Sequence, residues 1–153
     1  MNVLSRLFTT DSINLNVQAS NKVQAFENAG QYFATKLRIP SETVLSFLNA
    51  REALGSTGLG LGVAIPHGRI KGLEEPCAAL FRLQTPIEFG APDGNPVSLL
   101  LFLLVPEKAT QEHLEILAVI ARLLTSPQTL DQLQNETDPE KVRDLICDWE
   151  ALQ

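Results

Sequence analysis

The chain has 153 residues, of which 44% are hydrophobic and 20% are charged, and its formal net charge at pH 7 is −6. This length and this balance are typical of a globular protein with a single core, so we expect residues 1–153 to form one domain. The negative charge argues against nucleic acid and anionic membrane surfaces as partners, because both attract basic proteins.

The first part of the chain is predicted to form a short strand followed by two helices. Apolar and polar residues alternate over 13–15, as in a strand. Apolar residues recur at helical spacing over 21–37, which predicts an amphipathic helix with Val23 on its apolar face. A second helix is predicted to start at Pro40 and to end soon after Arg51, where glycines begin.

Strands are predicted in the middle of the chain. Short apolar runs indicate strands at 63–65 and 77–83, and the glycines and prolines of 87–97 indicate a hairpin or an excursion. Residues 97–105 are apolar except for one serine. This run is typical of a central strand that is covered on both faces, and it is too short to cross a bilayer as a helix, so we expect no membrane insertion.

The last part of the chain is predicted to form three helices. The first starts near Thr110, and the others start at Ser126–Pro127 and Asp138–Pro139. The inward stripe of the first of these helices is expected to consist of Leu114, Leu117, Ala118, Ala121 and Leu124. Together the elements predict an α/β fold in which a mixed β-sheet is sandwiched between helical layers.

His67 is one of only two histidines and follows a glycine-rich stretch between Arg51 and Arg69. An imidazole with an ordinary pKa near ~6.5 is largely neutral at pH 7 and can act as a nucleophile. Arginines can hold a phosphate group by bidentate hydrogen bonds. The combination favours a phosphorylatable histidine, and the alternative is a histidine with a purely structural role in the turn.

His113 falls in the first turn of the helix that follows the most apolar strand. Ligands gather beyond the carboxyl ends of strands in open α/β sheets, and a helix N-terminus attracts an anion. We therefore expect His67 and His113 to project from the same edge of the sheet and, with Arg51, to surround one phosphoryl group. The alternative is that His113 only caps its helix.

Other patterns that would indicate a cofactor or a different chemistry are missing from the sequence. The glycines within 58–62 match neither a dinucleotide-binding fingerprint nor a P-loop, and Ser56 lacks the setting of a hydrolase nucleophile. Cys77 and Cys147 are far apart and have no neighbouring histidine, unlike the ligands of a zinc site. We therefore expect no cofactor and no metal.

A longer motif runs from Glu52 through Leu59 and Gly60 to the Val-Ala-Ile-Pro-His-Gly sequence of 63–68. It resembles the phosphorylation-site signature of the fructose/mannitol-type enzyme IIA domains of the bacterial phosphotransferase system. That family also places an arginine 16 residues before the active histidine and a second histidine 46 residues after it, the positions of Arg51 and His113. The resemblance extends over nearly the whole chain and is greatest to the freestanding nitrogen-regulatory enzyme IIA.

The resemblance implies a cytoplasmic phosphocarrier. His67 would accept a phosphoryl group at Nε2 from the phosphohistidine of an HPr-like carrier, which is itself charged from phosphoenolpyruvate through an enzyme I. His113 would contact the phosphoryl oxygens, and Arg51 would orient or neutralise them. The implied partners are the HPr-like carrier and either regulatory target proteins or a IIB domain, with no metal or nucleotide at the site.

Three functions remain open on the sequence. The first is a regulatory phosphocarrier whose targets distinguish its phosphorylated and free forms. The second is a sugar-uptake enzyme IIA that passes the phosphoryl group to a separate IIB. The third is an interaction module that works independently of phosphorylation, against which the joint presence of Arg51, His67 and His113 counts. Leu59 and Leu61 are candidates for an apolar rim that docks the carrier.

Overall fold

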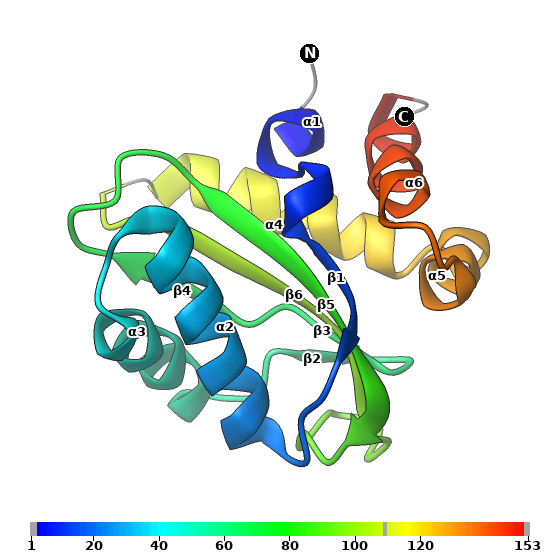
Figure 1. The fold of residues 1–153 in the computed structure, drawn as a ribbon, viewed down its shortest axis with the longest axis horizontal. Coiled ribbons are helices and arrows are strands. Elements are labelled where there is room, and N and C mark those ends of the chain that lie inside the picture. Colours follow the sequence, from blue (N-terminus) through cyan, green and yellow to red (C-terminus); the bar gives the residue numbers. More distant parts are fainter. Residues whose placement is uncertain (1–2, 109, 152–153) are drawn as a thin grey trace.

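The structure is a computed structural model that describes residues 3–108 and 110–151. Over these residues one six-stranded mixed sheet has helices on both faces (Figure 1), which confirms the predicted α/β class. The helices are α1 (Val3–Leu7), α2 (Lys22–Leu37), α3 (Ser41–Ala53), α4 (Thr110–Leu124), α5 (Pro127–Asn135) and α6 (Pro139–Ala151), and a 3-10 turn lies at Thr10–Ser12. The strands are β1 (Ile13–Val17), β2 (Gly58–Gly60), β3 (Val63–Ala64), β4 (His67–Ile70), β5 (Cys77–Ile87) and β6 (Val97–Pro106).

Strand β6 lies at the centre of the sheet. The order is β1-β5-β6-β3-β2, and β4 also pairs with β6. β6 runs antiparallel to β5 and parallel to both β3 and β4. Because β3 pairs at Leu99 and Leu100 while β4 begins opposite Leu103, these two short strands together form one strand along β6 that is interrupted in the middle.

The apolar run from Leu99 to Val105 in β6 is explained by a hydrophobic core on each face of the sheet. Alternate side chains of a strand point to opposite faces, so both sets of β6 residues are buried. The two sets are Leu99, Leu101, Leu103 and Val105 on one face and Leu100, Phe102 and Leu104 on the other. The first face is covered by α1, α4, α5 and α6, and the second by α2 and α3 (Figure 1).

Helix α2 begins as predicted, but its first turn differs from the expectation. The side chain of Asn21 caps the helix by accepting a 2.9 Å hydrogen bond from the backbone N–H of Gln24. Val23, expected on the apolar face, is 68% exposed, because it lies to one side of the buried stripe that passes through Phe26 and Phe33. The apolar face of α2 is therefore narrower than the sequence pattern suggests.

The strands also differ from the prediction. The strand expected at 63–65 ends at Ala64, and the one expected at 77–83 continues to Ile87. Strand β4 and helix α1 were not predicted at all. β4 offers only one large apolar residue, Ile70, and α1 is a single short turn of five residues, so neither element has a detectable periodicity.

The stripe predicted for helix α4 is partly wrong: Leu124 is buried and Leu117 and Ala121 pack against the core, but two of the predicted residues do not face inward. Leu114 is 61% exposed and Ala118 is also exposed, whereas the side chains that the helix buries are His113, Ile116, Ile120, Leu123 and Leu124. α4 carries apolar residues around much of its circumference, so their spacing fits more than one face. The face of α4 that contains Leu114 is therefore exposed at the surface.

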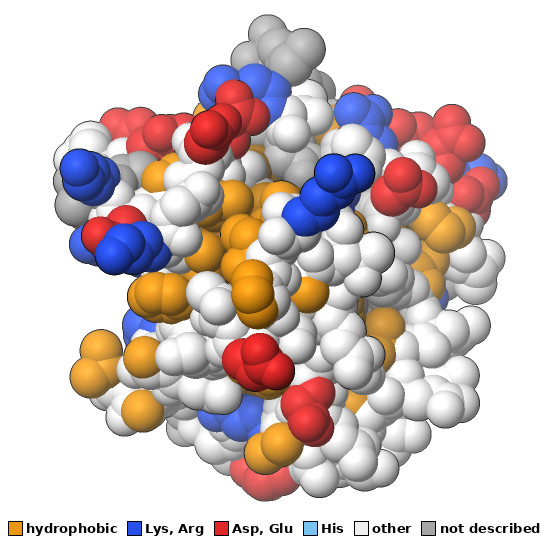
Figure 2. Space-filling model, turned by 60° about the vertical axis from the view of Figure 1, so that its left-hand side comes forward, with side chains coloured by type: hydrophobic (Ala, Val, Ile, Leu, Met, Phe, Trp, Pro, Cys, Tyr) orange, Lys and Arg blue, Asp and Glu red, His pale blue; other side chains and the backbone are white. Residues whose placement is uncertain are grey.

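Hydrophobic side chains reach the surface in patches. Figure 2 shows such side chains gathered in the middle of one face, with both basic and acidic side chains around them. The large hydrophobic residues that are exposed in the described structure are Val23, Leu54, Leu59, Leu61 and Leu114. Among residues 3–108 and 110–151, no helix has the length and apolarity needed to cross a membrane.

Candidate functional site

His67 lies at the break between β3 and β4. Pro66 has no N–H to donate, and its carbonyl accepts a 3.0 Å hydrogen bond from the N–H of Leu103. The N–H of Ile65 does not bond to β6; it donates to the carbonyl of Thr57 at 3.0 Å. The next residue, His67, starts β4 opposite Leu103 of the central strand. His67 therefore comes just after the end of β3, as expected, and it also begins a second short strand along β6 that was not predicted.

Gly68 allows helix α3 to approach this strand closely. A Cβ atom at this position would lie 3.2 Å from the backbone carbonyl carbon of Phe47 and 3.3 Å from its oxygen, closer than ordinary van der Waals contact. The absence of a side chain lets the backbone of α3 rest on β4. Arg51 follows Phe47 by about one helical turn, so this contact brings the guanidinium group to the histidine.

The imidazole of His67 is oriented by the backbone. Its Nδ1 lies 2.8 Å from the carbonyl oxygen of Ile65. A carbonyl can only accept a hydrogen bond, so Nδ1 carries the proton and donates it in the neutral ring. The lone pair is consequently on Nε2.

His113 lies against His67. The two ring centroids are 5.3 Å apart and the rings meet edge to face at 84°. His113 is only 6% exposed, and its Nδ1 is buried without a hydrogen-bond partner among the described residues. The structure thus brings together two histidines that are 46 positions apart in the sequence.

Both histidines border a hollow of about 430 Å³ that combines charged and apolar walls. Its charged residues are Arg51, Arg69 and Glu107, and its apolar residues include Phe47, Leu54, Leu114 and Leu117. Nη1 of Arg51 donates a 2.8 Å bond to the carbonyl of Gly55, which fixes the guanidinium group at the rim. Two arginines facing two neutral imidazoles can receive an anion with several oxygens.

Burial keeps both imidazoles neutral. It lowers the pKa of His67 below its usual 6.5; the bond to Ile65 opposes this shift, and the charge of Arg51 adds to it. Burial also lowers the pKa of His113 to about 4, with further contributions from His67, Arg69 and Arg51. At neutral pH the ring of His67 therefore keeps its nucleophilic lone pair, and the ring of His113 has one N–H.

The low pKa of His113 predicts a loss of stability on acidification. The unfolded chain takes up a proton on this histidine near pH 6.5, and the folded chain only near pH 4. Between these values the unfolded state binds more protons, so the free energy of unfolding falls as the pH falls, by at most about 1.4 kcal/mol per pH unit for this group. Urea unfolding across this range should show a shallower pH dependence for His113→Gln than for the wild type; identical dependences would contradict the prediction.

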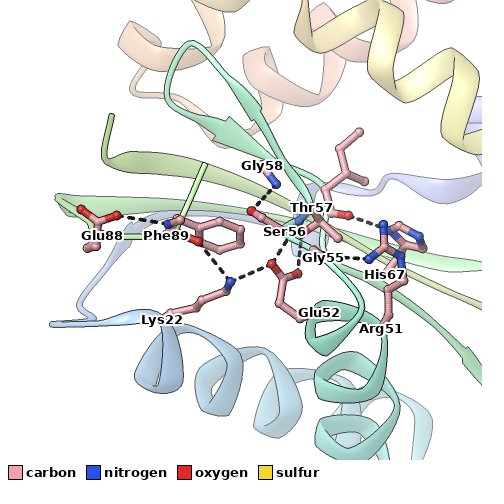
Figure 3. Close-up of polar contacts among 12 residues, drawn as sticks. Lys22, Arg51, Glu52, Gly55, Ser56, Thr57, Gly58, His67, Glu88 and Phe89 are labelled. Atoms are coloured by element: carbon pink, nitrogen blue, oxygen red, sulfur yellow. Dashed lines mark hydrogen bonds and ion pairs between the residues drawn. The ribbon is translucent and has the colours of Figure 1, made fainter. Parts of the chain in front are cut away.

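A network beside the site was not predicted from the sequence. The side chain of Glu52 is 8% exposed and forms a 2.7 Å ion pair with Lys22. Its two oxygens also accept bonds from Thr57, at 3.0 Å from the backbone N–H and 2.6 Å from the hydroxyl (Figure 3). Glu52 was noted only as part of a motif, because its partners come from other elements.

Among the described residues, no three His, Cys, Asp or Glu side chains are placed to hold a metal ion.

Comparison with known proteins agrees with this geometry. Residues 6–149 match the family described as "Phosphoenolpyruvate-dependent sugar phosphotransferase system, EIIA 2". The chain is 39% identical to the nitrogen regulatory protein of Pseudomonas aeruginosa, covering 95% of both chains. It is 31% identical to a fructose-specific EIIA component of Haloferax volcanii, covering 70% of both.

A solved structure extends the similarity to three dimensions. The crystal structure of the nitrogen regulatory protein IIA-Ntr from Neisseria meningitidis superposes with a TM-score of 0.91 at 39% identity, covering 95% of this chain and 99% of that one. The resemblance noted from the motif around His67 is thereby confirmed. The chain belongs to the EIIA 2 family of the phosphoenolpyruvate-dependent sugar phosphotransferase system, a family of phosphotransferase components.

Proposed function

We propose that this protein is a phosphocarrier that accepts a phosphoryl group on Nε2 of His67 from the phosphohistidine of an HPr-like carrier and then acts as a regulatory switch on target proteins. The observation that carries the proposal is the 2.8 Å bond between Nδ1 of His67 and the carbonyl of Ile65. This bond leaves the lone pair on Nε2, beside a second neutral histidine and two arginines.

The transfer step balances without an added base. The lone pair of Nε2 forms a new N–P bond while the N–P bond to the carrier's histidine breaks, and the electrons of the broken bond return to the carrier's imidazole. Nδ1 of His67 keeps its proton, and its hydrogen bond to the carbonyl of Ile65, throughout. The new N–P bond is of the same kind as the bond that breaks, so transfer can run in both directions.

The neighbours of His67 have complementary roles in this proposal. His113, neutral because its pKa is about 4, donates its N–H to a phosphoryl oxygen. Arg51 offsets the charge on the oxygens with the part of its guanidinium group that is not bound to Gly55. Arg69, which also borders the hollow, adds to the positive potential.

The carrier is proposed to dock on exposed leucines around the hollow. Leu54 and Leu114, which are 85% and 61% exposed, line the hollow beside His67. Leu59 and Leu61, the two candidates from the sequence, are 37% and 60% exposed. An apolar rim around a cationic centre would place the carrier's phosphohistidine opposite Nε2 of His67, and the negative net charge suits a basic carrier face.

A regulatory output is favoured by the relatives. The Pseudomonas aeruginosa and Neisseria meningitidis proteins, each 39% identical to this chain, are both named as nitrogen regulatory proteins. Phosphorylation would add nearly two negative charges to one surface, enough to change which proteins bind there. The second candidate, transfer to a IIB domain during sugar uptake, has the fructose-specific relative in its favour.

The direct test is intact-mass spectrometry at mildly alkaline pH, which preserves phosphohistidine, after incubation with phosphoenolpyruvate, enzyme I and an HPr-type carrier. We expect the mass of one phosphoryl group, dependent on the carrier and mapping to the peptide that contains His67. Omitting the carrier is the control. Lack of any added phosphoryl group with every carrier tried would contradict the proposal and favour the phosphorylation-independent interaction module.

A further inference from the structure

A chain of hydrogen bonds links a buried carboxylate to the ring of His67. Glu52 at the end of α3 binds both the backbone N–H and the hydroxyl of Thr57. The carbonyl of Thr57 accepts the N–H of Ile65 at 3.0 Å. The carbonyl of the same residue, Ile65, accepts Nδ1–H of His67 at 2.8 Å. Each bond holds one side of a residue, Thr57 or Ile65, whose following carbonyl makes the next bond.

Lys22 completes the network from the other side. Its Nζ lies 2.7 Å from Glu52 and 3.1 Å from the carbonyl of Phe89, and 4.0 Å from the centroid of the Phe89 ring (Figure 3). Lys22 is the first residue of α2, so the network ties α2, α3 and the loop before β6 to the segment at Thr57. A carboxylate this buried needs such a partner, because an unpaired charge there would be costly.

We infer that Glu52, paired with Lys22, is a positioning residue that holds the Ile65 carbonyl where it fixes the tautomer and orientation of His67. Glu52 does not touch the imidazole; it acts through Thr57 and Ile65. The inference rests on the proposed function, since it assigns Glu52 a part in making Nε2 the nucleophilic nitrogen.

The alternative is that Glu52 only stabilises the fold. A purely structural glutamate would change the free energy of unfolding but leave the imidazole unchanged in the molecules that remain folded. The bond geometry argues otherwise, because Thr57 is 6% exposed and binds Glu52 through two groups, so its peptide group has little freedom to compensate. Loss of these bonds should therefore loosen Thr57, the residue whose carbonyl binds Ile65.

The test is Glu52→Gln, which keeps the shape of the side chain and removes its charge. Two-dimensional ¹⁵N–¹H correlation spectra of the imidazoles at mildly alkaline pH report which nitrogen of His67 carries the proton. We expect the wild type to be protonated at Nδ1 and the variant to populate both tautomers. The rate of phosphoryl acceptance from an HPr-type carrier should fall roughly tenfold, as when an outer-shell partner is removed.

Two further variants keep the test decisive. Glu42→Gln makes the same change at an exposed position in the first turn of the same helix, and it should alter neither the spectrum nor the rate. Thr57→Val, nearly isosteric, removes only the 2.6 Å hydroxyl bond, and it should shift the tautomer in the same direction if Glu52→Gln does not fold.

The outcomes separate this inference from the proposed function. If Glu52→Gln folds and changes neither the tautomer nor the rate, while the wild type still accepts the phosphoryl group, the positioning role is overturned. If Glu52→Gln does not fold, the same result in Thr57→Val overturns it. A wild type that takes up no phosphoryl group would overturn the proposed function, whereas the tautomer measurement needs no phosphorylation and still reports on Glu52.

Discussion

Replacing His67 with glutamine is expected to abolish phosphoryl acceptance completely. Glutamine is polar and of similar size, and its amide can still reach the carbonyl of Ile65, but an amide nitrogen has no lone pair available for attack on phosphorus. His67 is only partly buried, so the variant should fold. Intact mass after incubation with the complete donor system should show no added phosphoryl group, and circular dichroism should match the wild type.

His113→Gln is the matched comparison, because it makes the same substitution 5.3 Å away between ring centroids. We expect this variant to accept the phosphoryl group more slowly, by roughly 10²–10³-fold, as when one preorganised donor is lost. Given enough time it should reach full occupancy. Phosphorylation of His67→Gln would contradict the assignment of the nucleophile, and if only His113→Gln lost the phosphoryl group, the two roles would have to be exchanged.

The largest effect on stability is expected at Phe102, in the centre of β6. Its side chain is fully buried, and its ring packs edge to face against Phe26 at 5.6 Å and Phe81 at 5.2 Å between centroids. Phe102→Ala removes the ring from the centre of the core that α2 and α3 cover, and such a cavity costs about 3–5 kcal/mol. Urea unfolding followed by circular dichroism should show the loss as a lower midpoint.

Val23→Ala serves as the control for that loss. Val23 is also apolar and lies on the same side of the sheet, but it is 68% exposed. Its truncation should change the free energy of unfolding by less than about 0.5 kcal/mol. Equal losses in the two variants would mean that the packing around Phe102 contributes far less than its burial implies.

Much of the fold could be predicted because its signals are local. The apolar run of β6 and the helical spacing of α2 follow from residues that are close in the sequence. β4 could not be predicted, because it becomes a strand by pairing with β6, more than 30 positions away. The orientation of α4 failed for a related reason: only the packing of the whole sheet decides whether Leu114 or Ile116 faces inward.

For the site, the sequence supplied the residue types but not their geometry. Spacing within a motif could pick out His67, and the strand before α4 could indicate His113. Neither could give the hydrogen bond from Nδ1 to the carbonyl of Ile65, which leaves the lone pair on Nε2. The buried pair of Glu52 and Lys22 joins two helices, so its partners become visible only once those helices are packed.

The interrupted strand places His67 and the exposed leucines around it on different elements of the fold. The imidazole of His67 is carried by β4, which pairs with the central strand β6 along its whole length. The exposed leucines lie in β2, in the turn after it, at the end of α3 and on the outer face of α4, where a substitution disturbs little else. If the proposed function holds, a lineage with this design can exchange one binding partner for another by changing these leucines, while the nitrogen that receives the phosphoryl group stays in place.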